Sequence, residues 1–130
     1  IAGTSLDPSK EADASKCLNA ARIVLNRGPI QLVVVHFPGG AVAITKDNEE
    51  FLVPSVAIPA KEIVGTNGAG DAFAAGILYG LHEDWTLSAT IQMAHASAAS
   101  SVRSLGTTDA VMSWQECLKL ASTWGWRTAI

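Results

Sequence analysis

The sequence predicts an α/β fold of three layers, with helices on both sides of a β-sheet. A dense run of apolar and β-branched residues over 30–37 is typical of a strand buried on both faces, as in a parallel sheet. One segment with helical periodicity precedes the strands, and three more follow them. With 130 residues, of which 48% are hydrophobic, the chain is long enough for one domain with its own core.

The first half of the chain is expected to hold one helix and three extended segments. Asp7 and Pro8 are typical of a helix start, and Gly28 ends that helix. Pro54 favours a position at the edge of the sheet, because proline cannot donate to a β-ladder. In chain order, the expected extended segments are 30–37, 41–45 and 51–58, with turns at 38–40 and 46–49.

The second half is expected to be helical. Thr86 is a typical N-cap, and Ser113 with Glu116 forms a capping box, in which each residue's side chain accepts the other's backbone N–H. Gly125 is the expected end of the last helix. The predicted helices are about 69–81, 87–101 and 114–124.

Charge and composition exclude several classes of protein. Nine basic and 12 acidic residues give a formal charge of −3 without a basic cluster, so no nucleic-acid partner is expected. The chain starts without the basic and apolar regions of a signal peptide, and its longest apolar stretch, 72–81, is too short to span a bilayer. Cys17 and Cys117 lack metal-ligand spacing and are expected to be free thiols. The sequence therefore predicts a soluble cytoplasmic protein without a membrane partner.

A glycine-rich segment at the start of the predicted helix 69–81 carries the chemistry. Backbone N–H groups at a helix start lack intrahelical partners and attract anions, and Gly68 and Gly70 allow close approach. Asp71 is unexpected beside a phosphate site unless it accepts a proton from the attacking group. A purely structural acid at a helix start is the alternative. No Walker A lysine follows, and Phe73 stands where a dinucleotide-binding loop has its third glycine.

Residues 66–76 read TNGAGDAFAAG and closely resemble the C-terminal signature of the PfkB (ribokinase-like) carbohydrate kinases, Asp-Thr-x-Gly-Ala-Gly-Asp-x-Phe. The order of predicted elements around the segment also fits that family. The resemblance implies a ribokinase-like fold of which residues 1–130 form the C-terminal, nucleotide-binding part. The N-terminal substrate-binding part and its lid are then expected to be absent from this chain.

The resemblance also implies roles for individual residues. Asp71 is similar to the catalytic base that accepts the proton of a sugar hydroxyl as it attacks the γ-phosphate of ATP. Gly68, Ala69 and Gly70 are similar to the anion hole for the transferred phosphoryl group. The implied nucleotide-binding residues are His36, Gly39, Gly40, Thr66, Asn67, His95, Ala98, Ala99 and Gly106.

The implied cofactors and partners are ATP with Mg²⁺ and a small sugar-like substrate, and no side chain is assigned as a metal ligand. Gly65 replaces an aspartate that the family has near its cation site, so potassium is less expected here than in a typical member. A homo-oligomer is left open, because a sheet edge exposed by the missing N-terminal part would favour self-association. The turn 38–41 also departs from the family's Gly-x-x-Gly pattern. Two alternatives remain: a non-catalytic fragment that binds nucleotide or another protein, and a dinucleotide-binding domain, which Phe73 disfavours.

Overall fold

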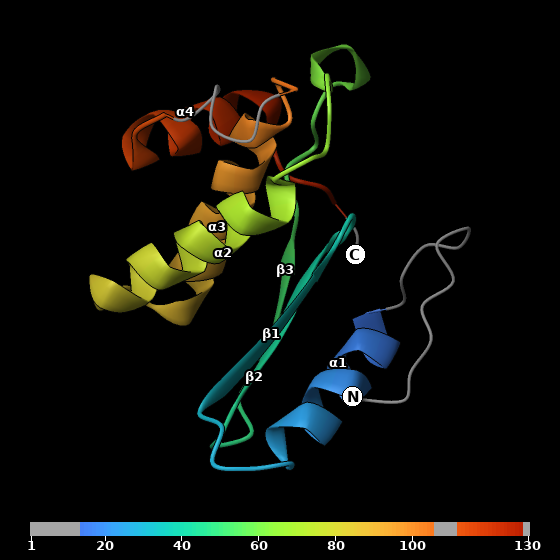
Figure 1. The fold of residues 1–130 in the computed structure, drawn as a ribbon, viewed down its shortest axis with the longest axis vertical. Helices are drawn as coiled ribbons and strands as arrows, with labels where there is room; N and C mark the ends of the chain where they lie inside the picture. Colours follow the sequence, from blue (N-terminus) through green and yellow to red (C-terminus); the bar gives the residue numbers. More distant parts are fainter. Residues whose placement is uncertain (1–13, 106–111, 129–130) are drawn as a thin grey trace. The chain divides into compact units, whose positions relative to one another are not determined.

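The computed structural model describes residues 14–105 and 112–128. The chain divides into two compact units, one formed by residues up to Pro54 together with the last three residues, and the other by Ser55–Arg127. Figure 1 shows the elements of both units in sequence colours. The expected helix start at Asp7 and Pro8 lies outside the described residues.

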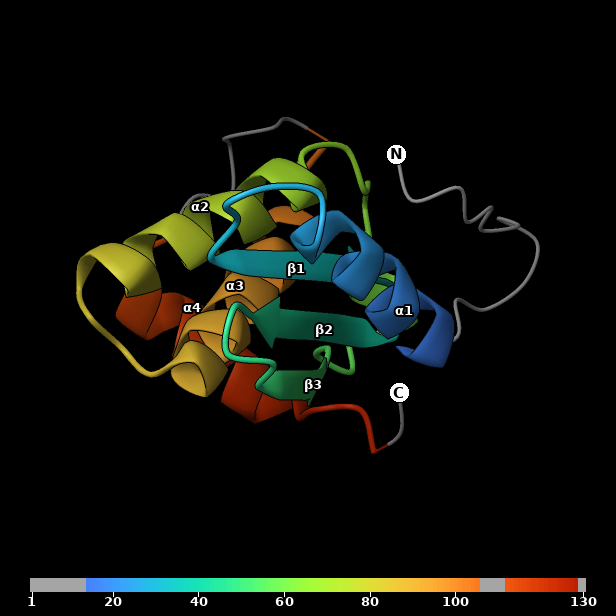
Figure 2. The same ribbon diagram turned by 90° about the horizontal axis from the view of Figure 1, so that it is seen from below.

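The first unit is a helix on a small sheet. Helix α1 (Ala14–Leu25) precedes β1 (Leu32–Phe37), β2 (Gly40–Thr45) and β3 (Glu50–Pro54), which pair in the order β1-β2-β3. Helix α1 lies across one face of β1 and β2, as Figure 2 shows. Its apolar side packs on that face. The buried side chains between helix and sheet are Cys17, Ala21, Leu25, Phe37, Val42 and Ile44.

The sheet corrects one prediction. Strand β1 is antiparallel to β2 and only partly buried, whereas the apolar run had indicated a parallel strand buried on both faces. The turn explains the difference, because Phe37 pairs with Gly40 across only two residues, which is enough for a hairpin and far too few for a parallel crossover. The central strand is β2, and its residues 41–44 are buried instead.

Two other expectations for this unit are confirmed, the turn at 46–49 and the edge position of Pro54. The third strand ends at Pro54 and not at 58, and α1 ends at Leu25, ahead of Gly28. The turn after β2 is closed by Thr45, whose N–H donates to the Glu49 carbonyl at 3.0 Å, and Asn48 takes the left-handed conformation with φ of 61°. Among the described strands, β3 pairs with β2 alone, so the segment that contains Pro54 lies at an edge as predicted.

The second unit consists of three helices and the segments that flank them. Helices α2 (Ala69–His82), α3 (Leu87–Ser101) and α4 (Trp114–Trp124) follow a short 3₁₀-helix η1 (Ala60–Glu62). Helix α3 contacts both α2 and α4. Val56, ahead of η1, forms an antiparallel bridge with Trp126, just after α4.

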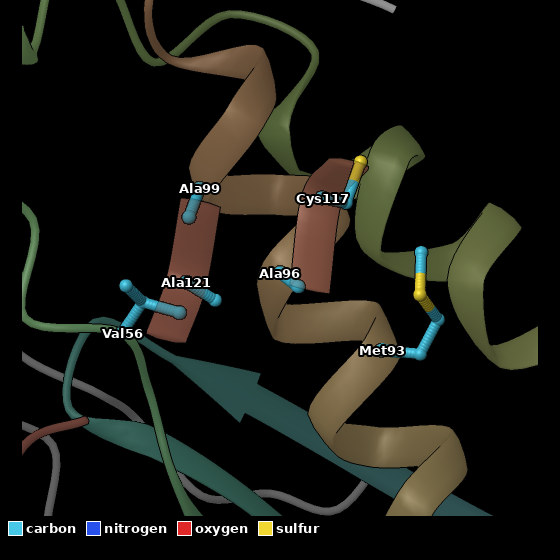
Figure 3. Packing of buried hydrophobic residues seen from close by; sticks show 6 residues of the cluster. All are labelled: Val56, Met93, Ala96, Ala99, Cys117 and Ala121. Atoms are coloured by element: carbon cyan, nitrogen blue, oxygen red, sulfur yellow. The ribbon is translucent and has the colours of Figure 1, made fainter. Parts of the chain in front are cut away.

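The core of the second unit lies between α3, α4 and the segment ahead of η1. Its six buried residues, shown in Figure 3, are small or flexible, and partly buried tryptophans pack around them. The cluster consists of Val56, Met93, Ala96, Ala99, Cys117 and Ala121. Cys17 and Cys117 are both buried free thiols, as predicted, and burial raises the pKa of the Cys117 thiol.

Local capping signals place the helices correctly. The Thr86 hydroxyl accepts the Ala89 N–H at 3.3 Å. At α4, the Ser113 hydroxyl accepts the Glu116 N–H, and the Glu116 carboxylate accepts the Ser113 N–H at 3.0 Å, which lowers the pKa of Glu116. The predicted bounds of all three helices agree with the structure to within one residue. None of the helices within the described ranges is long and apolar enough to cross a membrane.

Helices α2 and α3 touch along a row of small residues. A Cβ built on Gly76 would lie 2.5 Å from the Ala94 Cα, and one on Gly80 would lie 2.4 Å from the Thr90 Oγ1. The sequence had suggested that these two glycines allow close packing, and the partner is helix α3. At Gly76 the neighbouring atoms are backbone, so no larger residue fits there without moving a helix.

Gly76→Ala is expected to lower the free energy of unfolding by about 2 kcal/mol. Overpacking against the α3 backbone destabilises the fold by more than the higher helix propensity of alanine stabilises it. Denaturant unfolding followed by circular dichroism measures the change. Ala75→Ser, on an exposed position of the same helix, is the control and should change stability by only about 0.5 kcal/mol. Equal stabilities for Gly76→Ala and the wild type would contradict the close contact.

Thr90→Val is expected to raise the free energy of unfolding by about 1 kcal/mol. The Thr90 hydroxyl is fully buried and has no hydrogen-bond partner among the described residues, so the fold bears its desolvation without compensation. Valine keeps the branched shape and removes the unpaired group. Thermal unfolding of Thr90→Val and Thr90→Ser separates the effect of the hydroxyl from that of the side-chain shape. Serine keeps the hydroxyl and should not stabilise the protein.

Candidate active site

The candidate site is the start of α2, where a turn over residues 66–68 leads into the helix. Gly68 is the N-cap residue and has a φ of 83°, a left-handed conformation that glycine adopts without strain. The Ala69 N–H donates to the Thr66 carbonyl at 3.2 Å, and the Ala72 N–H donates to the Gly68 carbonyl at 2.9 Å. The second of these bonds is the first intrahelical bond of α2.

Three backbone N–H groups at this start remain without partners. Among the described residues, no carbonyl or side chain accepts a hydrogen bond from the N–H of Gly68, Gly70 or Asp71. A side-chain cap would normally accept from the second or third helical residue, here Gly70 or Asp71, but glycine at the N-cap has no side chain to do so. These donors therefore stay available to an anion, which the positive end of the helix dipole also favours.

The N–H groups without a described partner differ in one respect from the expected set. Gly68 and Gly70 were expected to donate together with Ala69. The Ala69 N–H is instead bonded within the turn, to the Thr66 carbonyl, and the Asp71 N–H is available in addition. Thr66 and Asn67 are exposed beside these donors, as expected of residues that lead the backbone into the site.

Asp71 lies in the first turn of α2 with its side chain exposed. No described residue forms a hydrogen bond or an ion pair with its carboxylate. The carboxylate can therefore accept a proton from an incoming group, and its position one residue after Gly70 keeps it next to the free N–H groups. An exposed carboxylate and N–H groups without a partner among the described residues thus stand together at one helix start.

The predicted residues of α3 are largely buried. The His95 side chain is 5% exposed, and its ring stands edge-on to that of Phe73 with the centroids 5.1 Å apart. The Ala99 methyl group belongs to the core cluster. Ala98 is half-buried, and its carbonyl accepts the Ser101 hydroxyl at 2.7 Å. In this structure the side chains of His95 and Ala99 act in packing, and Ala98 is the more accessible of the three.

The remaining predicted residues belong to the first unit or lie outside the described residues. His36, Gly39 and Gly40 belong to the first unit, at the hairpin between β1 and β2, where His36 pairs with Ala41. Partial burial lowers the pKa of His36. Gly40 is buried and Gly39 is half-buried. Gly106 lies outside the described residues.

The described residues contain no cluster of metal-ligating side chains. Within residues 14–105 and 112–128, no group of three or more His, Cys, Asp or Glu side chains could hold a metal ion.

The sequence did not indicate the contact between Phe73 and His95. Both residues stood out individually, Phe73 as part of the signature and His95 as a candidate ligand. They are 22 positions apart on different helices, so no local spacing signals that their rings meet. The helical periodicity of residues 69–81 does place Phe73 on the buried side, which is the one signal that could have found it.

Comparisons with known proteins give a consistent picture. The family profile described as pfkB family carbohydrate kinase matches residues 3–115. A 5-dehydro-2-deoxygluconokinase from Geobacillus kaustophilus is 38% identical over 80 residues, which cover 62% of this chain and 23% of the relative. An adenosine kinase from Schizosaccharomyces pombe is 30% identical over 84 residues, which cover 65% of this chain and 25% of the relative. The chain thus spans about a quarter of the length of these relatives.

Solved structures agree on the fold. A ribokinase from Thermotoga maritima superposes with a TM-score of 0.67 and 26% identity, covering 80% of this chain and 33% of that one. A ribokinase from Arabidopsis thaliana, solved with ribose and ATP, superposes with a TM-score of 0.67 at 20% identity. The match covers 83% of this chain and 38% of that one. The predicted ribokinase-like α/β fold is confirmed.

Proposed function

The chain belongs to the pfkB family of carbohydrate kinases, and we propose that it carries the phosphoryl-transfer centre of an ATP-dependent kinase. The acceptor is a hydroxyl group of a sugar or a related small molecule. The observation that carries this proposal is the start of α2, where the exposed Asp71 carboxylate adjoins N–H groups that have no partner among the described residues. The names of the relatives, a 5-dehydro-2-deoxygluconokinase and an adenosine kinase, support acceptors of this class.

The proposed reaction uses these groups in one step. Asp71 accepts the proton of the acceptor hydroxyl as its oxygen bonds to the γ-phosphorus of ATP, and the bond from that phosphorus to the β-phosphate oxygen breaks to release ADP. The N–H groups of Gly68, Gly70 and Asp71 donate to the oxygens of the transferred phosphoryl group. The carboxylate also orients the hydroxyl for attack in line with the leaving oxygen.

The nucleotide contacts are part of the same proposal. Thr66 and Asn67 contact the phosphates of ATP in this proposal, because both are exposed and directly precede the N–H donors of α2. We assign residues 1–130 to the C-terminal, nucleotide-binding part of such a kinase, with most acceptor contacts outside them. The hairpin glycines Gly39 and Gly40, the helix residue Ala98 and the loop residue Gly106 complete the proposed ATP contacts.

Asp71→Asn is expected to lower kcat by about 10³-fold, because asparagine cannot accept the proton, while the Kd for ATP stays within about threefold. Release of ADP over a panel of sugars and nucleosides measures turnover of the complete gene product, and calorimetry measures ATP binding. The matched control is Asp84→Asn, an exposed acid just beyond the other end of α2 whose φ of 56° asparagine also tolerates. Its turnover should match that of the wild type.

Two results would count against this assignment. Substantial turnover in Asp71→Asn would remove the aspartate from the role of base. ATP binding by the wild type without transfer to any acceptor would favour the alternative, a non-catalytic nucleotide-binding part.

Titration with inorganic phosphate or ATP is expected to shift the backbone amide resonances of Gly68, Gly70 and Asp71 in ¹⁵N-labelled protein. The Ala69 and Ala72 amides should shift much less, because both already donate within the protein. These two bonded amides are therefore internal controls at the same helix start. Saturable ATP binding that leaves the Gly70 and Asp71 resonances in place would contradict the proposed phosphate position.

A further inference from the structure

The start of α2 lacks the cap that the neighbouring helices have. A Thr86 hydroxyl caps α3 and a Ser113 hydroxyl caps α4, whereas no side chain caps α2 at Gly68. Glycine has no side chain that could accept from the N–H groups of the first turn. Tertiary packing is therefore the remaining source of order for the first turn of α2.

That packing comes from one turn of α3. Phe73, 4% exposed, meets the His95 ring edge-on, with 5.1 Å between centroids and 66° between ring planes. Next to His95, the Ala94 backbone lies against Gly76, where a Cβ would come within 2.5 Å of the Ala94 Cα. Two successive residues of α3 thus hold α2 at positions 73 and 76, which share one helix face.

The geometry connects this contact to the proposed site. Phe73 follows Asp71 by two residues, which is about 200° around an α-helix and about 3 Å along its axis. The two side chains therefore leave opposite sides of α2, and the structure has Phe73 buried and Asp71 exposed. A helical side chain also covers the turn that precedes its own Cα, so the Phe73 ring covers the first turn of α2 from the inside.

We propose that His95 is a positioning residue: through its ring contact with Phe73 it holds the first turn of α2, and with it the Asp71 carboxylate and the free N–H groups. The proposal rests on the proposed function for its catalytic consequence. It differs from the expectation that His95 binds nucleotide, because the imidazole is 5% exposed and is packed on Phe73.

Hydrogen exchange of two matched amides tests the structural part without any need for activity. The Ala72 N–H donates to the N-cap carbonyl of α2 at 2.9 Å, and the Cys117 N–H donates to the N-cap carbonyl of α4 at 3.0 Å. In His95→Ala, exchange at Ala72 should rise about tenfold relative to Cys117. In His95→Phe, which keeps an aromatic ring, the ratio should return to within about threefold of the wild type.

A third variant, His95→Gln, keeps hydrogen-bonding capacity but has no ring, and its exchange should match that of His95→Ala. Equal changes at the two amides in His95→Ala, including loss of both on unfolding, would overturn the proposal. So would a His95→Gln variant with wild-type exchange at Ala72, because a polar contact and not the ring would then hold the turn.

Kinetics of the complete gene product test the catalytic part. His95→Ala should lower kcat about tenfold or more with the KM for ATP nearly unchanged, because a small displacement of the reacting groups costs rate more than binding. His95→Phe should restore kcat. If His95→Phe instead raises the KM for ATP at unchanged kcat, His95 is a nucleotide ligand and the proposal fails. Failure of the proposed function looks different, since Asp71→Asn would then keep its turnover while the exchange result stands.

Discussion

At Gly76 and Gly80, α2 lies so close to α3 that a methyl group does not fit between the helices. At Gly76 the neighbouring atoms belong to the Ala94 backbone, and at Gly80 they belong to the Thr90 side chain. Contacts this close leave little freedom for one helix to slide or roll over the other. The Phe73–His95 ring pair lies at the same interface, near the start of α2. The position of that start in space, and therefore of the Asp71 carboxylate, follows from how the two helices fit together.

The fold could be predicted from the sequence wherever the signal was local. The Thr86 cap, the Ser113–Glu116 capping box and Gly125 placed the ends of α3 and α4, because each acts within a single turn of its own helix. The direction of β1 was predicted wrongly from its apolar content, which does not distinguish an antiparallel strand from a parallel one. The two-residue connection at 38–39 was the better signal, since a parallel neighbour requires a crossover of a dozen or more residues.

In the candidate site, too, local features could be predicted from the sequence, and contacts between distant residues could not. The glycine-rich turn and the acid after it were recognisable as a local motif, and the structure has both at a helix start. Whether a given N–H is free could not be predicted, because the bond from Ala69 to Thr66 depends on the conformation of the turn. The burial of His95 and Ala99 depends on contacts with α2 and α4, which are distant in sequence. The small residues on α3 had indicated space for a ligand. In the structure, Ala99 belongs instead to the hydrophobic core.

Under the proposed function, glycine at position 68 reconciles the stability of α2 with anion binding at its start. A serine, threonine or aspartate cap would stabilise α2, but its oxygen would accept from the N–H of Gly70 or Asp71, the same groups that an anion needs. Glycine leaves these donors free and also permits the left-handed turn, at the cost of a weaker helix start. Contacts with α3 offset that cost from the buried side of the helix, where they do not compete with a ligand. An uncapped helix start that is held rigid from behind is what a phosphoryl-transfer site requires, because donors that are already fixed in place need no reorganisation when charge develops on the transferred group.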